Sequence, residues 1–150
     1  MLDAVLLTVD SEARSRDVRL IREEIENTYV SGSRLRLEQA ILNLMANAIK
    51  FNRPGGEVRV RAEHRPYGQV AILIADTGVG IPSQDLPRIF ERFYRVDKAR
   101  SRQVGGTGLG LSIVKHVVER MKGAISVESQ LGRGSTFTLL LPSVGPPPRA

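Results

Sequence analysis

A run of glycines at residues 105–111 is the first group whose type and spacing could do chemistry. It reads Gly-Gly-Thr-Gly-Leu-Gly-Leu and stands where a polar loop gives way to a helical pattern over residues 108–122. Glycines let backbone N–H groups turn toward an anion, and the unpaired amides and positive dipole end of the helix behind them would face the same point. The run predicts a phosphate site, although taken alone such stretches are most often turns or linkers. It fits neither a Walker P-loop nor a dinucleotide fingerprint.

An aspartate at the end of a predicted strand is the second candidate. The apolar run 70–75 is rich in β-branched residues, and Asp76-Thr-Gly-Val-Gly80-Ile81 follows it. An ionised Asp76 can only accept hydrogen bonds, so it would accept from the exocyclic amine of adenine and repel the carbonyl oxygen of guanine. The alternative is that Asp76 merely caps a turn, as Asp-Thr-Gly often does.

A predicted helix over residues 34–50 carries the third candidate. One stripe is apolar, and Asn43, Asn47 and Lys50 form a polar stripe beside it at i, i+4 and i+7. An Asn carbonyl can ligate Mg²⁺, which keeps several waters and takes other oxygens from phosphates. Lys50 adds a charge for phosphate oxygens, and Phe51 an aromatic face for a base. A solvated helix face, with Phe51 in the core, is the alternative.

The elements that must position these residues follow from the periodicity of the chain. Strands are predicted at residues 18–24, 57–63, 70–75, 124–128 and 135–141, with hairpin turns around 65–69 and 129–134. Helices are predicted at 34–50, 84–89 and 108–122, with Ser33 as an N-cap and Gly123 as a left-handed C-terminal residue. Strands that do not alternate strictly with helices favour an α+β fold.

Four segments in this order resemble the ATP-binding catalytic domain of sensor histidine kinases. They are Asn43 to Phe51, Asp76 to Gly80, Arg88-Ile-Phe90-Glu-Arg-Phe93-Tyr-Arg95 and the glycine run, which match the N, G1, F and G2 boxes of that family. The resemblance covers residues 17–142. It implies a two-layer α/β sandwich, with a mixed, mostly antiparallel sheet covered on one face by helices, as in the gyrase and MutL (GHKL) ATPases.

The resemblance also implies which residues hold ATP and Mg²⁺. Asn47 would bind Mg²⁺, and Asn43, Lys50 and Arg95 would act in catalysis, with Arg95 on the γ-phosphate. Residues 91–106 would form a lid over ATP, with Phe90 and Phe93 anchoring its base. The implied nucleotide-binding residues are Asn43, Asn47, Lys50, Phe51, Asp76, Gly78, Gly80, Ile81, Tyr94, Arg95, Gly106, Thr107, Gly108, Leu109 and Gly110.

One position separates the subfamilies. The hydrolysing ATPases of this superfamily carry Glu as a general base four residues before the metal-binding Asn, and here that place is Asn43. A neutral amide is no base near pH 7, so transfer of the γ-phosphate to another nucleophile is favoured over hydrolysis. A nucleotide-sensing pseudokinase and an anti-sigma-type serine kinase or GHKL ATPase are the alternatives.

The histidine that should receive the phosphate is not recognisable in this chain. His64 and His116 both lack the motif that the family uses around its phosphoacceptor, and both are expected to be ordinary structural or surface histidines. A separate phosphoacceptor and dimerisation domain is therefore the expected partner, with a response regulator acting after it. We expect residues 1–16 to be a linker or helix remnant of that domain, and residues 143–150 to be a disordered Pro-rich tail.

Composition limits the remaining possibilities. The chain has 150 residues, no cysteine and a formal net charge of +6, which suits one well-cored domain without disulfides in a cytoplasmic setting. The 22 lysines and arginines are scattered rather than clustered with aromatics, so no specific nucleic-acid partner is expected. No apolar run approaches the roughly 20 residues that span a bilayer, so a membrane anchor would belong to the full-length kinase. The fragment itself is expected to be monomeric.

Overall fold

A five-stranded sheet forms one layer of the protein. The computed structural model describes residues 1–96, 108–146, 148 and 149. Its strands are β1 (Arg19–Ile25), β2 (Glu57–Arg65), β3 (Gln69–Asp76), β4 (Ala124–Gln130) and β5 (Gly134–Pro142), and their spatial order is β1-β2-β3-β5-β4. The pair β1–β2 is parallel and the other three pairs are antiparallel. The predicted mixed, mostly antiparallel sheet is confirmed, with both hairpins where they were expected.

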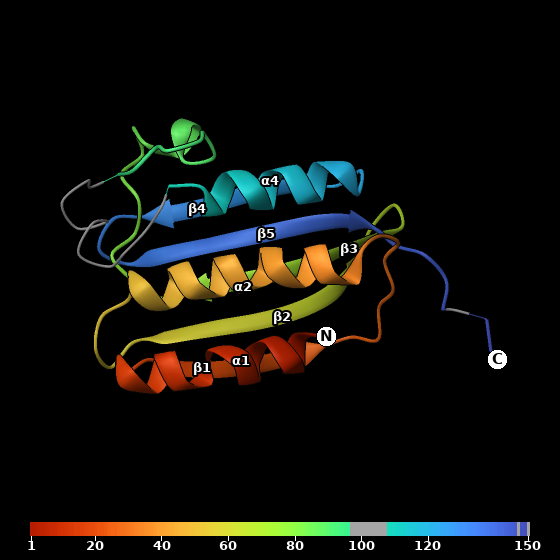
Figure 1. Cartoon of the computed structure of the whole chain (residues 1–150), viewed down its shortest axis with the longest axis horizontal. Coiled ribbons are helices and arrows are strands. Elements are labelled where there is room, and N and C mark those ends of the chain that lie inside the picture. Colours follow the sequence, from red (N-terminus) through yellow and green to blue (C-terminus); the bar gives the residue numbers. More distant parts are fainter. Residues whose placement is uncertain (97–107, 147, 150) are drawn as a thin grey trace.

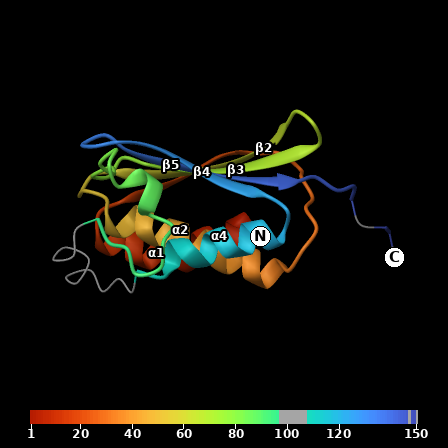
Figure 2. The same cartoon turned by 90° about the horizontal axis from the view of Figure 1, so that it is seen from above.

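Helices cover one face of this sheet. In the described part of the chain these are α1 (Leu2–Ser15), α2 (Arg34–Lys50) and α4 (Gly110–Arg120), with a short 3-10 helix η1 (Leu86–Arg88). Viewed along the sheet, all three α-helices lie on the same side of it (Figure 2). The helix α2 packs between α1 and α4 (Figure 1). This arrangement is the predicted two-layer α+β sandwich.

The core lies between the two layers. Val70, Ile72 and Ile74 alternate along β3 and point into the core, as the period of two along a strand requires. The opposing face of α2 buries seven residues, namely Leu37, Ala40, Ile41, Leu44, Met45, Ala48 and Ile49. The apolar stripe read from the sequence is therefore the face of α2 that meets the sheet.

The ends of α2 agree with the prediction. The Ser33 hydroxyl accepts a hydrogen bond from the backbone N–H of Arg36 at 3.3 Å, which satisfies one of the unpaired amides of the first turn. The helix ends at Lys50, and Phe51 follows as its C-cap.

Two other helix predictions were wrong in detail. The helix expected over 84–89 is only the 3-10 helix η1, because Pro87 lacks the N–H that a longer helix would need. The helix expected over 108–122 is shorter, and Lys122 rather than Gly123 takes the left-handed conformation, with φ +60°. A Cβ on Gly123 would lie 2.4 Å from the Leu140 carbonyl oxygen, so glycine is required there by close packing.

The first segment of the chain is a helix within the helical layer. Its residues Leu2, Val5, Val9 and Ala13 are buried in the same core cluster as α2 and β3. Of the two alternatives for residues 1–16, the structure therefore has a helix rather than an extended linker. That the segment continues a preceding domain stays a prediction.

Backbone pairing extends two residues beyond the end that we expected for the ordered chain. Val30 and Ser143 form an isolated antiparallel bridge, and the backbone N–H of Val144 donates to the Tyr29 carbonyl at 2.9 Å. These bonds tie residues 143 and 144, which we had placed in a disordered tail. Across the described ranges, no helix is both long and apolar enough to cross a membrane.

Candidate nucleotide-binding site

Three elements that carry predicted site residues meet at one end of the molecule. The last turn of α2, the end of β3 and the start of α4 all lie at the left-hand end of Figure 1. Asp76, the last residue of β3, continues the inward-facing series of Val70, Ile72 and Ile74. Its carboxylate is therefore on the side of the sheet that the helices cover.

The carboxylate of Asp76 is held by backbone amides through one oxygen. Its Oδ1 accepts from the Gly78 N–H at 2.8 Å and from the Ser135 N–H at 3.3 Å. Burial raises the pKa of Asp76, and these two hydrogen bonds lower it in part. No donor from the described residues hydrogen-bonds the other oxygen, Oδ2. The Asx turn that we gave as an alternative is thus present, and it leaves one carboxylate oxygen for a ligand.

The turn after Asp76 is fitted closely to the end of α2. The Val79 N–H donates to the Phe51 carbonyl at 3.1 Å. A Cβ on Gly78 would lie 2.6 Å from that same oxygen, so only glycine fits at this position. This close approach ties the G1 box to the last turn of the N box.

The same turn is also tied to the β4–β5 hairpin. The Ile81 N–H donates to the Ser129 hydroxyl at 2.8 Å, and the Gly132 N–H donates to the Val79 carbonyl at 2.8 Å. Gly80 has φ +72°, and a Cβ there would lie 2.2 Å from the Gln130 carbonyl oxygen. Gly78 and Gly80 therefore have a structural reason to be glycine that is independent of any nucleotide.

The polar stripe of α2 is present as predicted. Asn43, Asn47 and Lys50 lie on one face of the helix and are half-buried. Their side chains make no hydrogen bond or ion pair with any residue that the structure describes. Two amide groups and an ammonium group are thus left to meet another partner, and amide oxygens are ligands that Mg²⁺ accepts.

The residues of the F box differ in their roles. Phe90 is partly buried and meets the Phe137 ring edge-to-face, with centroids 6.4 Å apart. The side chain of Phe93 is exposed instead, at 70%, and the lid whose base Phe90 and Phe93 were expected to anchor stays a prediction. The backbone of Phe93 takes φ +63°, and its N–H donates to the Gly108 carbonyl at 2.8 Å.

The side chain of Tyr94 contacts Asp85 rather than Asp76. Its hydroxyl donates to the buried carboxylate of Asp85, and the Arg88 guanidinium lies 4.6 Å from its ring centroid. The hydrogen bond to Asp85 raises the pKa of Tyr94. Arg95 follows and is half-buried. The nucleotide contacts expected of Tyr94 and Arg95 stay predictions.

The G2 box is described only from Gly108 onward. Gly106 and Thr107, both predicted to bind nucleotide, lie outside the described residues, as does most of the expected lid. Gly108 has φ +78° and packs on the Phe93 backbone. Leu109 is the N-cap of α4 and Gly110 its first residue, so both stand at the helix N-terminus, the end of a helix that favours an anion.

Sequence patterns did not indicate four polar residues that lie around Asp76 and the turn after it. The hydroxyl oxygens of Ser129 and Ser135 are 2.7 Å apart. The side chains of Asn52 and Thr77 hydrogen-bond each other. Strand parity could have found Ser135, because it extends the inward series of Phe137 and Leu139. No sequence signal pairs Asn52 with Thr77.

Comparison with known proteins shows the family to which the chain belongs. The model of the histidine kinase-, DNA gyrase B-, and HSP90-like ATPase family matches residues 32–145. The chain belongs to this family. It is 42% identical over 152 residues to the sensor-like histidine kinase SenX3 of Mycobacterium tuberculosis, covering 96% of this chain and 37% of SenX3.

Solved structures place it more narrowly within the ATPase family. The mycobacterial sensor histidine kinase MprB superimposes with a TM-score of 0.82 at 34% identity, covering 95% of both chains. Full-length ShkA, solved in complex with AMPPNP, gives a TM-score of 0.82 at 31% identity and covers 95% of this chain and 29% of ShkA. The protein is an ATP-binding catalytic domain of the sensor histidine kinase type. It spans about a third of the curated relatives that it matches.

Proposed function

We propose that this domain binds Mg-ATP and donates its γ-phosphate to a histidine on a separate phosphoacceptor domain. The observation that carries the proposal is the carboxylate of Asp76. One oxygen is fixed by two backbone amides and the other has no donor among the described residues. It stands at the end of the molecule that also holds the half-buried polar stripe of α2 (Figure 1).

Asp76 would select the base. An ionised carboxylate accepts the exocyclic amine of adenine, whereas guanine presents a carbonyl oxygen at that place and would leave two acceptors facing each other. Partial burial strengthens this discrimination, because water cannot compensate for the mismatch. Phe51, at the C-cap of α2, and Ile81 would lie beside the base.

The polar groups of α2 and of the F box would hold the phosphates. The amide oxygen of Asn47 suits Mg²⁺, and no cluster of three acidic or His side chains that could hold a metal alone occurs among the described residues. Such a donor set fits an ion that takes its other ligands from phosphates and water. Bound Mg²⁺ supplies charge neutralisation at the phosphates, while Lys50 and Arg95 would stabilise the charge that develops on the γ-phosphoryl group.

The acceptor is proposed to be a histidine on another domain. Asn43 stands where a hydrolysing relative needs a general base, so it would bind without activating water. His64 and His116 are both exposed. His64 lies on β2, and His116 lies in the second half of α4, six residues beyond Gly110. We place the domain on the cytoplasmic side of a sensor kinase, as a monomer when isolated, with a response regulator receiving the phosphate next.

Parallel calorimetric titration with Mg-ATP and Mg-GTP tests the binding half of the proposal. Moderate salt suppresses the attraction between a basic protein and any polyphosphate. We expect selective binding of ATP that depends on Mg²⁺. Equal binding of both nucleotides, lost as salt rises, would overturn the assignment of Asp76.

Transfer needs the full-length kinase. Arg95→Ala in that protein should preserve affinity for ADP while lowering the rate of histidine phosphorylation, because ADP lacks the γ-phosphate. Equal loss of ADP affinity and of transfer would remove Arg95 from this role. Rapid release of inorganic phosphate without phosphohistidine would instead favour a hydrolysing ATPase.

A further inference from the structure

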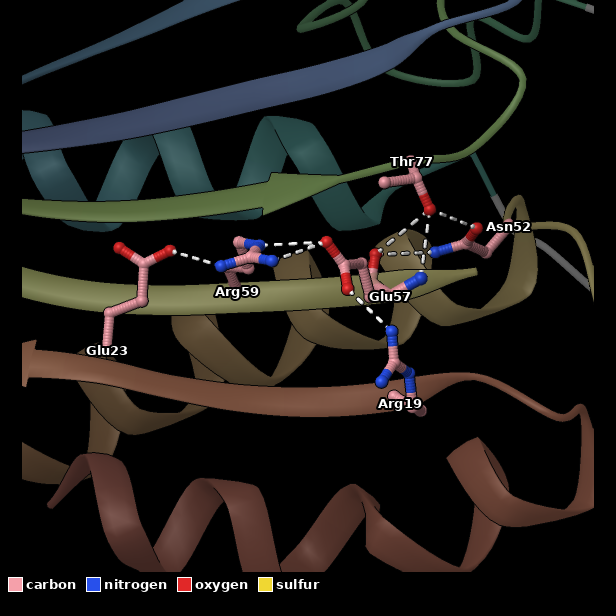
Figure 3. Close-up of polar contacts among 6 residues, drawn as sticks. All are labelled: Arg19, Glu23, Asn52, Glu57, Arg59 and Thr77. Carbon is pink, nitrogen blue, oxygen red and sulfur yellow. Dashed lines mark hydrogen bonds and ion pairs between the residues drawn. The ribbon is translucent and has the colours of Figure 1, made fainter. Parts of the chain in front are cut away.

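A partly buried hydrogen-bond network joins the residues just after α2 to the residue that follows Asp76. The Thr77 hydroxyl donates to the Asn52 Oδ1 at 3.2 Å and accepts from the Glu57 N–H at 2.9 Å. The Asn52 Nδ2 donates to the Glu57 carbonyl at 3.0 Å. Figure 3 shows the two side chains meeting at the start of β2.

The network is closely packed. Asn52 is 9% exposed, and its Oδ1 also accepts from the Arg53 N–H at 2.9 Å. A Cβ on Gly56 would lie 2.1 Å from that Oδ1 and 2.8 Å from the Thr77 Oγ1. The chain therefore leaves room for the Asn52–Thr77 contact by having glycine at position 56.

Two consecutive residues that directly follow α2 hold the turn after Asp76. Phe51 uses its carbonyl, which accepts from the Val79 N–H at 3.1 Å. Asn52 uses its side chain, which contacts Thr77. Asp76 thus stands between a strand that fixes its backbone and a turn that is clamped at both Thr77 and Val79.

We propose that Asn52 and Thr77 are positioning residues that hold the Asp76 carboxylate where it discriminates adenine from guanine. The inference rests on the proposed function, because it assigns to these residues the positioning of Asp76 within the proposed nucleotide site. Neither side chain needs to touch the nucleotide. A loosened turn would let the Gly78 N–H leave the Asp76 Oδ1, and the carboxylate could then rotate away from the base.

The outer part of the same network does not share this role. Arg19 and Arg59 bind the Glu57 carboxylate at 3.1 and 2.8 Å, and Arg59 also pairs with Glu23 at 3.2 Å. Both arginine side chains are well exposed, so solvent and salt screen these pairs. They contact the Glu57 carboxylate, whereas Asn52 bonds the backbone carbonyl of Glu57 and Thr77 bonds its backbone N–H (Figure 3). Arg59→Ala is therefore a matched control within the network.

The test uses Thr77→Val, Thr77→Ser, Asn52→Ala and Arg59→Ala. Amide hydrogen exchange of Gly78 and Ser135 is measured without nucleotide, followed by affinities for Mg-ATP and Mg-GTP. We expect Thr77→Val and Asn52→Ala each to speed exchange at these two amides and to lower ATP affinity about tenfold, with a smaller ATP-to-GTP ratio. Thr77→Ser keeps the hydroxyl and should restore both values, and Arg59→Ala should change neither.

Amide exchange and nucleotide affinity together distinguish failure of the positioning role from failure of the proposed function. Unchanged Gly78 exchange and an unchanged ATP-to-GTP ratio in a folded Thr77→Val or Asn52→Ala protein would overturn the positioning role, even if the parent binds ATP. Lower stability with an unchanged ratio would also overturn it, because that is the result of a merely structural network. If the parent binds no ATP, the proposed function fails, while amide exchange still reports whether the pair fixes Asp76. Circular dichroism identifies any variant that does not fold, in which case the other variant decides.

Discussion

The backbone N–H of Phe93 donates a 2.8 Å hydrogen bond to the carbonyl oxygen of Gly108. This bond joins the end of the F box to the last glycines of the G2 box. Gly108 has φ +78°, and a Cβ there would lie 2.8 Å from the Phe93 Cα. The two backbones therefore meet at a distance that only glycine allows.

Gly108→Ala should weaken Mg-ATP binding about tenfold or more, because the new methyl group pushes Phe93 and the following Tyr94 and Arg95 away. Gly68→Ala is the matched control. Gly68 also has a positive φ, +67°, but nothing lies within 4 Å of its Cβ position. Both changes carry the left-handed strain of about 1 kcal/mol or more, so both should lower the melting temperature, whereas only Gly108→Ala should affect titrations with ATP. Equal affinities of the two variants would contradict the role of this contact.

Asp76→Asn should lower the affinity for ATP without lowering the stability of the protein. The variant loses the charge that accepts the adenine amine, so ATP affinity should fall about tenfold or more and the preference over GTP should shrink. Burial raises the pKa of Asp76, which means that its ionised form is unfavourable in the folded protein at neutral pH. The denaturation midpoint of Asp76→Asn at pH 7 should therefore be at least that of the parent. A large loss of stability would show that the negative charge supports the fold.

The stability gained by Asp76→Asn should depend on pH in one direction. A carboxyl whose pKa is raised in the folded state contributes stability that is fully present below the unfolded pKa, near 3.8, and is lost as pH rises through the folded value. The difference in unfolding free energy between variant and parent should thus shrink as pH falls from 7 toward 4. ATP affinity of the parent should decline over the same range, because protonation removes the negative charge that accepts the adenine amine and makes one carboxyl oxygen a donor. Chemical denaturation and titration at several pH values measure both, and a pH-independent difference would contradict the burial effect.

Asn47→Ala should remove the part of ATP affinity that depends on Mg²⁺. The amide oxygen of Asn47 is half-buried and makes no hydrogen bond with a described residue, so it is available as a ligand. In titrations, the ATP affinity of the parent should be higher in Mg²⁺ than in EDTA, whereas that of the variant should be nearly the same in both buffers. In Mg²⁺ the variant should bind ATP about tenfold more weakly than the parent. Equal affinity of the parent in both buffers would remove Asn47 from the metal site.

Val5→Ala should show that α1 belongs to the cooperative core. Val5 is 1% exposed and Leu7, two residues on in the same helix, is 79% exposed. Loss of two buried methyl groups costs about 1.5 kcal/mol or more, with a cavity term added. Leu7→Ala should stay within about 0.5 kcal/mol of the parent. Urea unfolding measures both, and equal effects would mean that α1 unfolds separately from the sheet.

Sequence patterns located the parts of this protein that local rules control. The cap at Ser33 and a sustained apolar period set both ends of α2, and β-branched runs placed every strand to within two residues at each end. The period of two also determined the face on which Asp76 lies. Each of these features depends on residues within a few positions of one another.

Features that depend on distant residues were not predictable. Lys122 rather than Gly123 is left-handed, and Gly123 instead packs against the Leu140 carbonyl, a contact with a residue distant in the sequence. Asn52 and Thr77 are 25 residues apart, and only the pairing of β2 with β3 brings them together. The backbone bond of Phe93 to Gly108 likewise joins residues that sequence periodicity does not relate.

The single parallel pair in the sheet has a consequence for how the chain folds. Arg19 pairs with Glu57 across a connection that contains all of α2, whereas β2–β3 and β4–β5 are joined by tight turns. Closing a long connection costs more chain entropy than closing a hairpin, and hairpins form in roughly 1–10 μs. We expect β1 to add to the sheet after α2 has docked, so that the slowest step of folding is the completion of this edge.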